Sequence, residues 1–442
     1  MDVQHTDIII NNCDIAATEE GASDRAIQYD DGDLDFTTLT ITNTHISAPL
    51  WDPMTLMGNN QGIGVKTRAK NTTFSMTNCT VNGFRHCAEW KGNFTPGNVY
   101  LTNCIFQNFN NGRGNHIQEF TDGEVIITDC SYIGSPGNKP DGGDEALRIQ
   151  NSTNMEVTID GLQTGNSEEA VTCDQDHRTT FLINDAHILA MSGEAEQGFK
   201  ILESTDASWR ITNSSIHGFQ SGIECFNGNT GSGGTPSEPR HIRNSSITFS
   251  NSLFENNQRA IRVQGTAASS GPNTLTVTGT VILRSSFTGQ FTAVSFEDTA
   301  SPGGSALFRN CTFHDNNQNG VTNTAGSAYP ITIDYCIFSE WGVNALSQAS
   351  TGVAMSENFN VFVDLSSSAQ FGGAQAAAIV HGGGSLAASA LEDVYCDQDP
   401  LSLTYLFIRA DGMAAAIDGA KNAGAKDTCF VTTDVENWSL YR

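Results

Sequence analysis

Apolar and polar residues alternate in short runs along most of this chain, and each run is too short to form a helix. One recurring run has a small residue followed by an apolar, a polar and another apolar residue. Copies of it occupy residues 26–29, 146–149, 170–173, 222–225, 260–263 and 293–296. Because successive side chains of a strand point to opposite faces, one apolar set faces inward in each copy. The pattern predicts many short strands with polar outward positions.

A second run has Thr and Asn followed by Cys or Ser and then an apolar residue. Its asparagine recurs at Asn12, Asn43, Asn78, Asn103, Asn184, Asn213, Asn251 and Asn310, with Asp129 and Arg284 in its place in two copies. Asparagine tolerates the left-handed backbone of a tight bend and bonds to neighbouring groups. We therefore expect these side chains to stack on adjacent turns, with Asn78 beside Asn103.

The cysteines beside these asparagines occupy a position that serine fills in other copies. They are Cys13, Cys79, Cys104, Cys130, Cys311 and Cys336. This exchange predicts small packed side chains, because no spacing typical of a metal site accompanies them. Only Cys396 and Cys429, in the irregular tail, are expected to form a disulfide.

Copies that repeat in register predict an all-β fold, a single right-handed parallel β-helix of about twelve coils over residues 1–365. Residues 366–442 are expected to form an irregular, partly helical capping region of the same domain. The helical expectation rests on the alanine-rich segments 374–390 and 413–421.

The formal charge of −27 argues against nucleic acid as a partner, because binding phosphates needs clustered Lys and Arg. No apolar run approaches the roughly 20 residues that span a bilayer, so we expect no membrane insertion. The segment after Met1 has neither a basic nor an apolar region, and we expect no export signal in this chain.

The repeated Asn-Cys-x-Phe and Ala-Ile-x-Val runs resemble those of the pectin-lyase-like superfamily over residues 5–365, and 399–401 with 416–420 resemble the closing segment of secreted bacterial surface β-helix proteins. The resemblance implies an extracellular, cell-surface or virion-surface protein that binds a polysaccharide along the outward face of its first sheet. Such proteins include lyases, hydrolases, tailspikes, adhesins and structural proteins, so fold alone does not choose among them.

That outward face supplies candidate residues for a polysaccharide lyase. Such an enzyme needs a base, here Lys200 or His177, and a cation to stabilise the enolate. We predict one row in which Glu89, Gln118 and Arg148 are neighbours and a second in which Lys91, Phe120 and Gln150 are neighbours. The remaining candidates are listed by role: Arg148 and Arg262 hold the substrate carboxylate, Glu89, Lys91, Phe120, Phe226 and His177 bind substrate, and Asp174, Asp176 and Glu224 recruit Ca²⁺.

Two other interpretations of these residues stay open. Lys200, Glu224 and Arg262 are also explained as an exposed row of alternating charges, each pair contributing below about 1 kcal/mol. A glycoside hydrolase, the less favoured enzyme, needs two carboxylates about 5 to 9.5 Å apart, which Asp141, Asp144 and Glu145 offer. The same letters are typical of a turn.

A non-catalytic role is the alternative to glycan binding. Nothing in the sequence precedes the strand expected at residues 3–10, so its edge needs a cover. Head-to-tail assembly into a filament, or use as an adhesin or phage tail fibre, would supply one. Whether the protein is an enzyme is undecided at this point.

Overall fold

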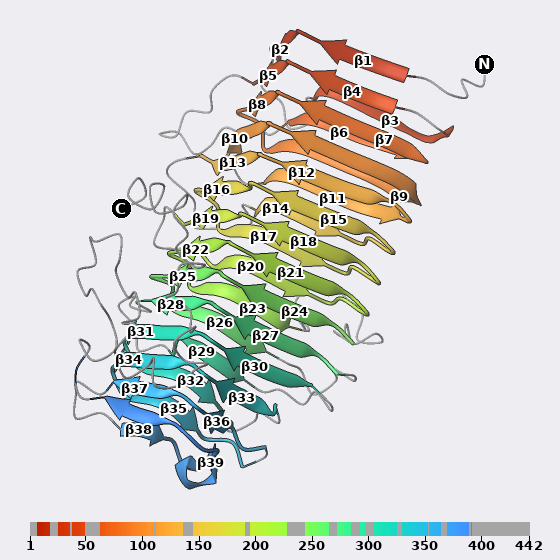
Figure 1. The fold of residues 1–442 in the computed structure, drawn as a ribbon. Helices are drawn as coiled ribbons and strands as arrows, with labels where there is room; N and C mark the ends of the chain where they lie inside the picture. Colours follow the sequence, from red (N-terminus) through yellow and green to blue (C-terminus); the bar gives the residue numbers. More distant parts are fainter. Residues whose placement is uncertain are drawn as a thin grey trace. The chain divides into compact units, whose positions relative to one another are not determined.

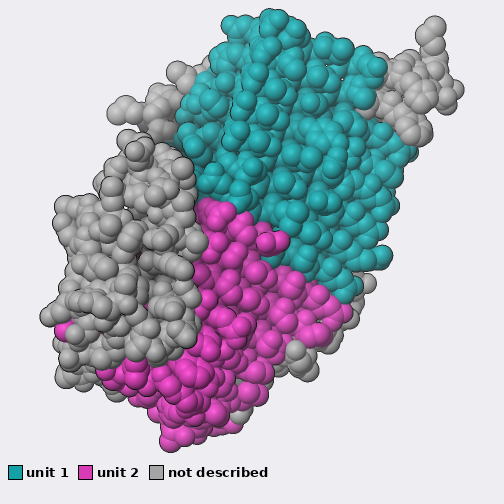
Figure 2. Space-filling model, in the orientation of Figure 1, with its two compact units in different colours: residues 1–209 teal, residues 210–442 magenta. Residues whose placement is uncertain are grey.

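A computed structural model gives the structure of the protein and describes residues 7–17, 25–35, 38–48, 62–109, 112–135, 145–190, 195–227, 244–264, 272–283, 292–297, 304–324, 329–351, 353–363, 369–388 and 390. Within these ranges the chain is an all-β parallel solenoid, which confirms the predicted fold class (Figure 1). Successive strands go in turn to three parallel sheets, called C, A and B here. The chain divides into two compact units, residues 1–209 and 210–442 (Figure 2).

The first unit contains seven described strands of sheet C, which are β3 (Arg25–Asp35), β6 (Ile63–Lys70), the start of β9 (His86–Thr102), β11 (Arg113–Thr121), β14 (Glu145–Gln150), β17 (Glu169–Asp174) and β20 (Gln197–Leu202). Its sheet A strands are β1 (Asp7–Asn11), β4 (Thr38–Thr42), β7 (Thr72–Thr77), the end of β9, β12 (Glu124–Thr128), β15 (Glu156–Asp160) and β18 (Thr180–Asn184). Its sheet B strands are β2 (Asp14–Ala16), β5 (His45–Ser47), β8 (Thr80–Asn82), β10 (Ile105–Phe109), β13 (Ser131–Gly134), β16 (Gln163–Gly165) and β19 (His187–Leu189). The boundary between the units falls within β21 (Ser208–Thr212).

The second unit repeats this plan. Its described sheet C strands are β23 (Ser221–Asn227), β26 (Arg259–Gln264), β29 (Val294–Glu297), β32 (Asn319–Asn323), β35 (Asn344–Gln348) and β38 (Ala369–Gly372). Its sheet A strands are β24 (Ser246–Ser250), β27 (Thr274–Thr278), β30 (Ser305–Arg309), β33 (Ile331–Asp334), β36 (Ser356–Asn358) and β39 (Val380–His381). Its sheet B strands are β22 (Ser215–His217), β25 (Leu253–Glu255), β28 (Val281–Leu283), β31 (Thr312–Asn316), β34 (Ile337–Trp341), β37 (Val361–Val363) and β40 (Leu386–Ala388).

Sheet B has 14 strands in the described parts of the chain, so the number of coils differs slightly from the predicted twelve. The alanine-rich segment 374–390 does not form the expected helix. It holds only a three-residue 3-10 turn, η1 (Ala376–Ala378), and otherwise continues the sheets as β39 and β40. The parallel pairing satisfies its backbone groups with the previous coil. Residues 413–421, Cys396 and Cys429 lie outside the described residues, and the boundary at 365 stays a prediction.

The core is built from the inward residue of every rung. In the first unit Phe106 stacks on Tyr132 with ring centroids 4.9 Å apart, and Phe181 stacks on Trp209 at 5.3 Å. In the second unit Phe338 stacks between Phe313 and Phe362. Identical positions on parallel strands bring like side chains together, and large stacked rings bury much apolar area.

The predicted asparagines lie at corners with left-handed backbone. The φ angles of Asn43, Asn78 and Asn103 are 48°, 52° and 50°. The side-chain amide of Asn78 donates to the amide oxygen of Asn43 at 3.2 Å, and that of Asn103 donates to Asn78 at 3.3 Å. Asn184 is an exception: Asp185, with φ of 52°, holds the corner there instead. Arg284 lies outside the described residues. Among the described cysteines all nine are free, and those of the second run are buried except for Cys13.

No helix in the described ranges has both the length and the apolarity that a bilayer crossing requires.

Candidate functional site: the charged face of sheet C

The outward side of sheet C in the first unit carries aligned polar residues that we call the charged face. One column, in register on adjacent strands, is Lys66, Glu89, His116, Arg148, Thr172 and Lys200. The next column is Arg68, Lys91, Gln118, Gln150 and Asp174. A third, where the strands begin, is His86, Arg113, Glu145 and Glu169. Parallel pairing repeats at about 4.8 Å and brings these groups within reach of one another.

Arg148 is the centre of the charged face. Its Nη1 lies 2.9 Å from Glu145 Oε1 and its Nη2 lies 2.7 Å from Asp174 Oδ2, so one guanidinium bridges two carboxylates. Arg113 also pairs with Glu145. The Arg148 side chain is 18% exposed and both carboxylates are nearly buried. The bridge neutralises charges that would be costly to leave unpaired at this depth.

The predicted base Lys200 is also committed to an ion pair. Its Nζ lies 2.5 Å from Glu169 Oε1, and Thr172 Oγ1 donates to Glu169 Oε2 at 2.9 Å. Lys91 pairs in the same way with Glu119, at 2.6 Å. An ion pair with a carboxylate favours the charged form of a lysine, and a charged lysine cannot accept a proton as a base must. The ion pair with Glu169 therefore argues against Lys200 as the base, while the row of Lys200, Glu224 and Arg262 stays a prediction.

The two glutamates of the third column have opposite pKa shifts. For Glu145, burial favours the neutral form, but the positive charges of Arg113 and Arg148 outweigh it and lower the pKa. For Glu169, burial raises the pKa. The positive charge of Lys200 lowers it in part, the negative charge of Glu145 raises it again, and the net shift is upward. Glu145 and Glu169 are direct partners on adjacent strands. Such a pair, one ionised and one ready to hold a proton, is the arrangement that acid–base chemistry needs.

His116 is a member of the charged face that the sequence did not reveal. Burial, together with Arg113 and Arg148, lowers its pKa to about 3, so its imidazole is neutral. Its Nε2 lies 3.3 Å from Gln150 Oε1, and a neutral imidazole that donates there keeps Nδ1 as an acceptor. Gln150 Nε2 in turn donates to Asp174 Oδ2 at 3.1 Å.

The predicted column placed Gln118, not His116, beside Glu89 and Arg148. The difference arises because Asn115 takes an inward position that is apolar in other coils, which interrupts the alternating pattern at this rung. Asn115 is fully buried and donates to the hydroxyl of Tyr132 at 3.3 Å. Gly114, which precedes Asn115, is a small residue like those that begin this run in other coils, and it marks where the run starts here.

Phe120 corrects a second prediction. It was expected to face outward and stack on sugar rings, but its side chain is 0% exposed and packs edge-on against Phe74. The register of β11 shifts after Gln118, and Glu119 has a left-handed φ of 60°. This bulge inserts one residue and turns the next side chain into the core.

Two of the predicted calcium ligands, Asp174 and Asp176, lie in different surroundings. Asp176 is 0% exposed in the core, where its Oδ1 accepts the Ser152 N–H at 3.0 Å, while Asp174 is held by Arg148 on the outward side. Glu224 belongs to the second unit. In the described part of the chain no three His, Cys, Asp or Glu side chains are placed to hold a metal ion.

The other candidates lie in different surroundings. Arg262, in the second unit, pairs with Glu224 at 3.3 Å and with Glu297 at 3.0 Å. Phe226 lies in β23, and its side chain is outside the described residues. His177 lies at the exposed corner between sheets C and A, beside Arg178, and not on the outward columns.

Lys66 and Arg68 are the least committed cations of the charged face. Lys66 has no hydrogen bond or ion pair within the described ranges, and Arg68 Nε donates only to the amide oxygen of Asn93, at 2.8 Å. Glu89 beside them accepts from Gln118 Nε2 at 3.2 Å. These cations remain available to a ligand.

Comparison with solved structures finds proteins of very different sequence that are similar to this chain. The endo-xylogalacturonan hydrolase from Aspergillus tubingensis is 11% identical, with 78% of this chain and 95% of that chain covered and a TM-score of 0.39. The Dettilon tailspike protein is 13% identical over 80% and 62% of the two chains, with a TM-score of 0.32. The catalytic domain of a GH87 alpha-1,3-glucanase is 9% identical over 77% and 61%, with a TM-score of 0.24. No protein-family model and no curated protein matches the chain.

Proposed function

We propose that the first unit binds an anionic polysaccharide along the charged face. The observation that carries the proposal is a pair of cations without an ion-pair partner in the described ranges, Lys66 and Arg68, on a regular polar surface of a chain whose net charge is −27. Glu89, Gln118 and His116 continue that surface with groups that accept or donate hydrogen bonds to hydroxyls. Repeated strands offer a repeating ligand the same contact on successive rungs.

The proposal is tested by titrating a panel of uronate and neutral polysaccharides into the protein and into the Lys66→Ala, Arg68→Ala double variant. We expect the variant to bind a uronate polymer about tenfold or more weakly, because two charge-assisted contacts are lost. Arg210→Ala removes an exposed cation from the outward side of β21 and is the matched control. Equal affinity of the double variant and the control would contradict the proposal.

A second candidate function, hydrolysis of the bound chain, is favoured by Glu145 and Glu169. In this scheme protonated Glu169 gives its proton to the departing glycosidic oxygen while Glu145 acts on the anomeric carbon or its attacking water, so that one water is consumed per bond. Glu145 and Glu169 are in-register partners on adjacent strands, whose backbones lie about 4.8 Å apart. Side chains that leave neighbouring strands on the same face can bring their carboxyl groups within the separations of about 5 to 9.5 Å known for such pairs.

Product chemistry separates this scheme from lyase action by Lys200. Hydrolysis yields new reducing ends without ultraviolet absorbance, whereas elimination yields an unsaturated product. We expect Glu169→Gln to lower the rate at least about 100-fold. Glu119→Gln, which removes the carboxylate that pairs with Lys91 beside the charged face, is the control. An unsaturated product that disappears in Lys200→Ala would instead restore the lyase interpretation.

We also propose an extracellular or surface location, which rests on the sequence resemblance alone. Fractionation of the source cells with an antibody to the protein tests it. Head-to-tail assembly remains a prediction, and sedimentation over a range of concentrations would detect it.

A further inference from the structure

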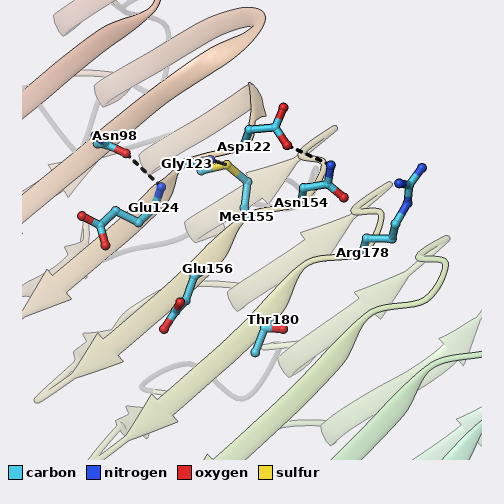
Figure 3. Close-up of a pocket in the computed structure, with 9 residues that line it drawn as sticks. All are labelled: Asn98, Asp122, Gly123, Glu124, Asn154, Met155, Glu156, Arg178 and Thr180. Carbon is cyan, nitrogen blue, oxygen red and sulfur yellow. Dashed lines mark hydrogen bonds between the residues drawn. The ribbon is translucent and has the colours of Figure 1, made fainter.

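A groove lies in the first unit along the corner where the chain passes from sheet C to sheet A. Its volume is about 610 Å³. The corner residues Asp122, Asn154 and Arg178 form one side, and Glu124, Glu156 and Thr180, at the starts of β12, β15 and β18, form the other (Figure 3). It is separate from the charged face, whose columns are made by sheet C residues.

The backbone holds the groove in a defined shape. The three corner residues have left-handed φ angles of 50°, 53° and 50°. Their backbone N–H groups donate to backbone carbonyls of the next coil, at 3.0 Å for Asp122, 2.9 Å for Asn154 and 2.8 Å for Arg178. Each lining position therefore stays in register with its neighbours on the adjacent rungs.

Two glutamates occupy neighbouring positions of this groove, and neither forms an ion pair in the described part of the chain. Glu124 and Glu156 are in-register partners of β12 and β15. Glu124 accepts the hydroxyl of Tyr100, while Glu156 is exposed and has no hydrogen bond or ion pair in the described part of the chain. Like charges directly opposite on neighbouring strands are unfavourable. A bound positive group would relieve that repulsion.

The rest of the lining suits hydroxyl groups. Asn154 Nδ2 donates to Asp122 Oδ1 at 2.9 Å, which leaves its amide oxygen as an acceptor, and Asn98 Oδ1 accepts the Glu124 N–H at 3.0 Å, which leaves its amide NH₂ as a donor. The Arg178 side chain makes no ion pair within the described ranges. Donors and acceptors thus flank the carboxylate pair on both sides.

We infer that this corner groove binds an amino sugar, with its ammonium group between Glu124 and Glu156 and its hydroxyls on Asn98, Asn154 and Arg178. A neutral sugar would leave the two carboxylates opposed, and an anionic sugar would add to the repulsion. The ligand therefore differs in charge from the one proposed for the charged face. The two proposals stand or fall separately.

The test compares a glucosamine tetramer with its N-acetylated counterpart, in which an acetyl group on each nitrogen removes the positive charge and adds bulk; the Glu156→Gln variant separates the effect of charge from that of size. Calorimetric titration at fixed ionic strength should show the amine form binding at least tenfold more tightly. Glu156→Gln should remove most of this preference. Asp129→Asn, an equal charge change at another left-handed corner of the same unit, should change affinity less than twofold and controls for general attraction to an acidic protein.

Two outcomes would overturn the inference. One is equal binding of the amine and acetylated tetramers. The other is an equal loss in Glu156→Gln and Asp129→Asn, which would mean that only the net charge is sensed. Circular dichroism of both variants confirms that each is folded, and amide hydrogen exchange with bound tetramer should protect the corner at Asn154 rather than the charged face.

Discussion

The outward side of sheet C differs between the two units, although the inward side is mostly apolar in both. In the first unit it is the charged face, with a cation, a carboxylate or both on every rung from β6 to β20. Among the described residues of the second unit, charge on this face gathers around Arg262, and the column then continues with Ser295, Thr322 and Ser347. The repeat that builds the core leaves the outward positions free to vary, so function is to be sought where they depart from a simple polar row.

The largest expected effect concerns the two arginines of that comparison. We expect Arg148→Met to lower the free energy of unfolding of the first unit by about 3 to 5 kcal/mol, because two nearly buried carboxylates lose the positive charge that they share. Arg262→Met should cost clearly less in the second unit, since its side chain is 27% exposed and Glu297 is accessible to water. Urea unfolding followed by near-ultraviolet dichroism measures both, and equal losses would mean that the two faces do not differ in depth.

The second prediction concerns buried corner oxygens. Asp176 in the first unit and Asn273 in the second each accept a backbone N–H of the preceding coil, at 3.0 and 3.1 Å. Asp176 Oδ2 has no partner, and burial raises its pKa well above the ordinary value of 3.8. The unfolded chain therefore releases this proton first, and stability falls as pH rises above about 4, by up to about 1.4 kcal/mol per pH unit.

Asp176→Asn should flatten that decline and stabilise the first unit at pH 8, by about 1 to 3 kcal/mol, because an amide needs no proton to remain neutral. Asn273→Asp is the reciprocal change and should introduce the same decline in the second unit. Thermal unfolding at pH 5 and pH 8 measures both. A variant Asp176→Asn that keeps the wild-type dependence on pH would show that the carboxyl is not the source.

A smaller effect is expected for Lys200→Met on the charged face. Its ion pair with Glu169 is partly exposed, and Glu169 can take up a proton when the lysine is gone, so the loss should be about 1 kcal/mol. Removing the cation should raise the pKa of Glu169 further. Carboxyl titration by nuclear magnetic resonance measures that shift, and a fall in the pKa would contradict the assigned pairing.

The smallest effect is expected at the exposed edge of sheet B. Asp14 lies 3.2 Å from His45, but both side chains are largely exposed, so Asp14→Asn should leave unfolding unchanged within error. A measurable loss there would show that surface pairs matter more in this fold than solvent screening allows.

Alternation, small residues and recurring Thr-Asn-Cys runs were enough to predict a parallel solenoid and the contact between Asn78 and Asn103, because those features repeat and depend only on local geometry. Which side chains share an outward column was harder to predict. One bulge at Glu119 moved Phe120 into the core, and one buried Asn115 concealed His116, since a shift of register reverses every side chain beyond it. The pairing of Lys200 with Glu169, the bridge at Arg148 and the burial of Asp176 depend on which rungs are neighbours and on how deeply each lies. Those relations join residues far apart in the chain, and only the folded arrangement decides them.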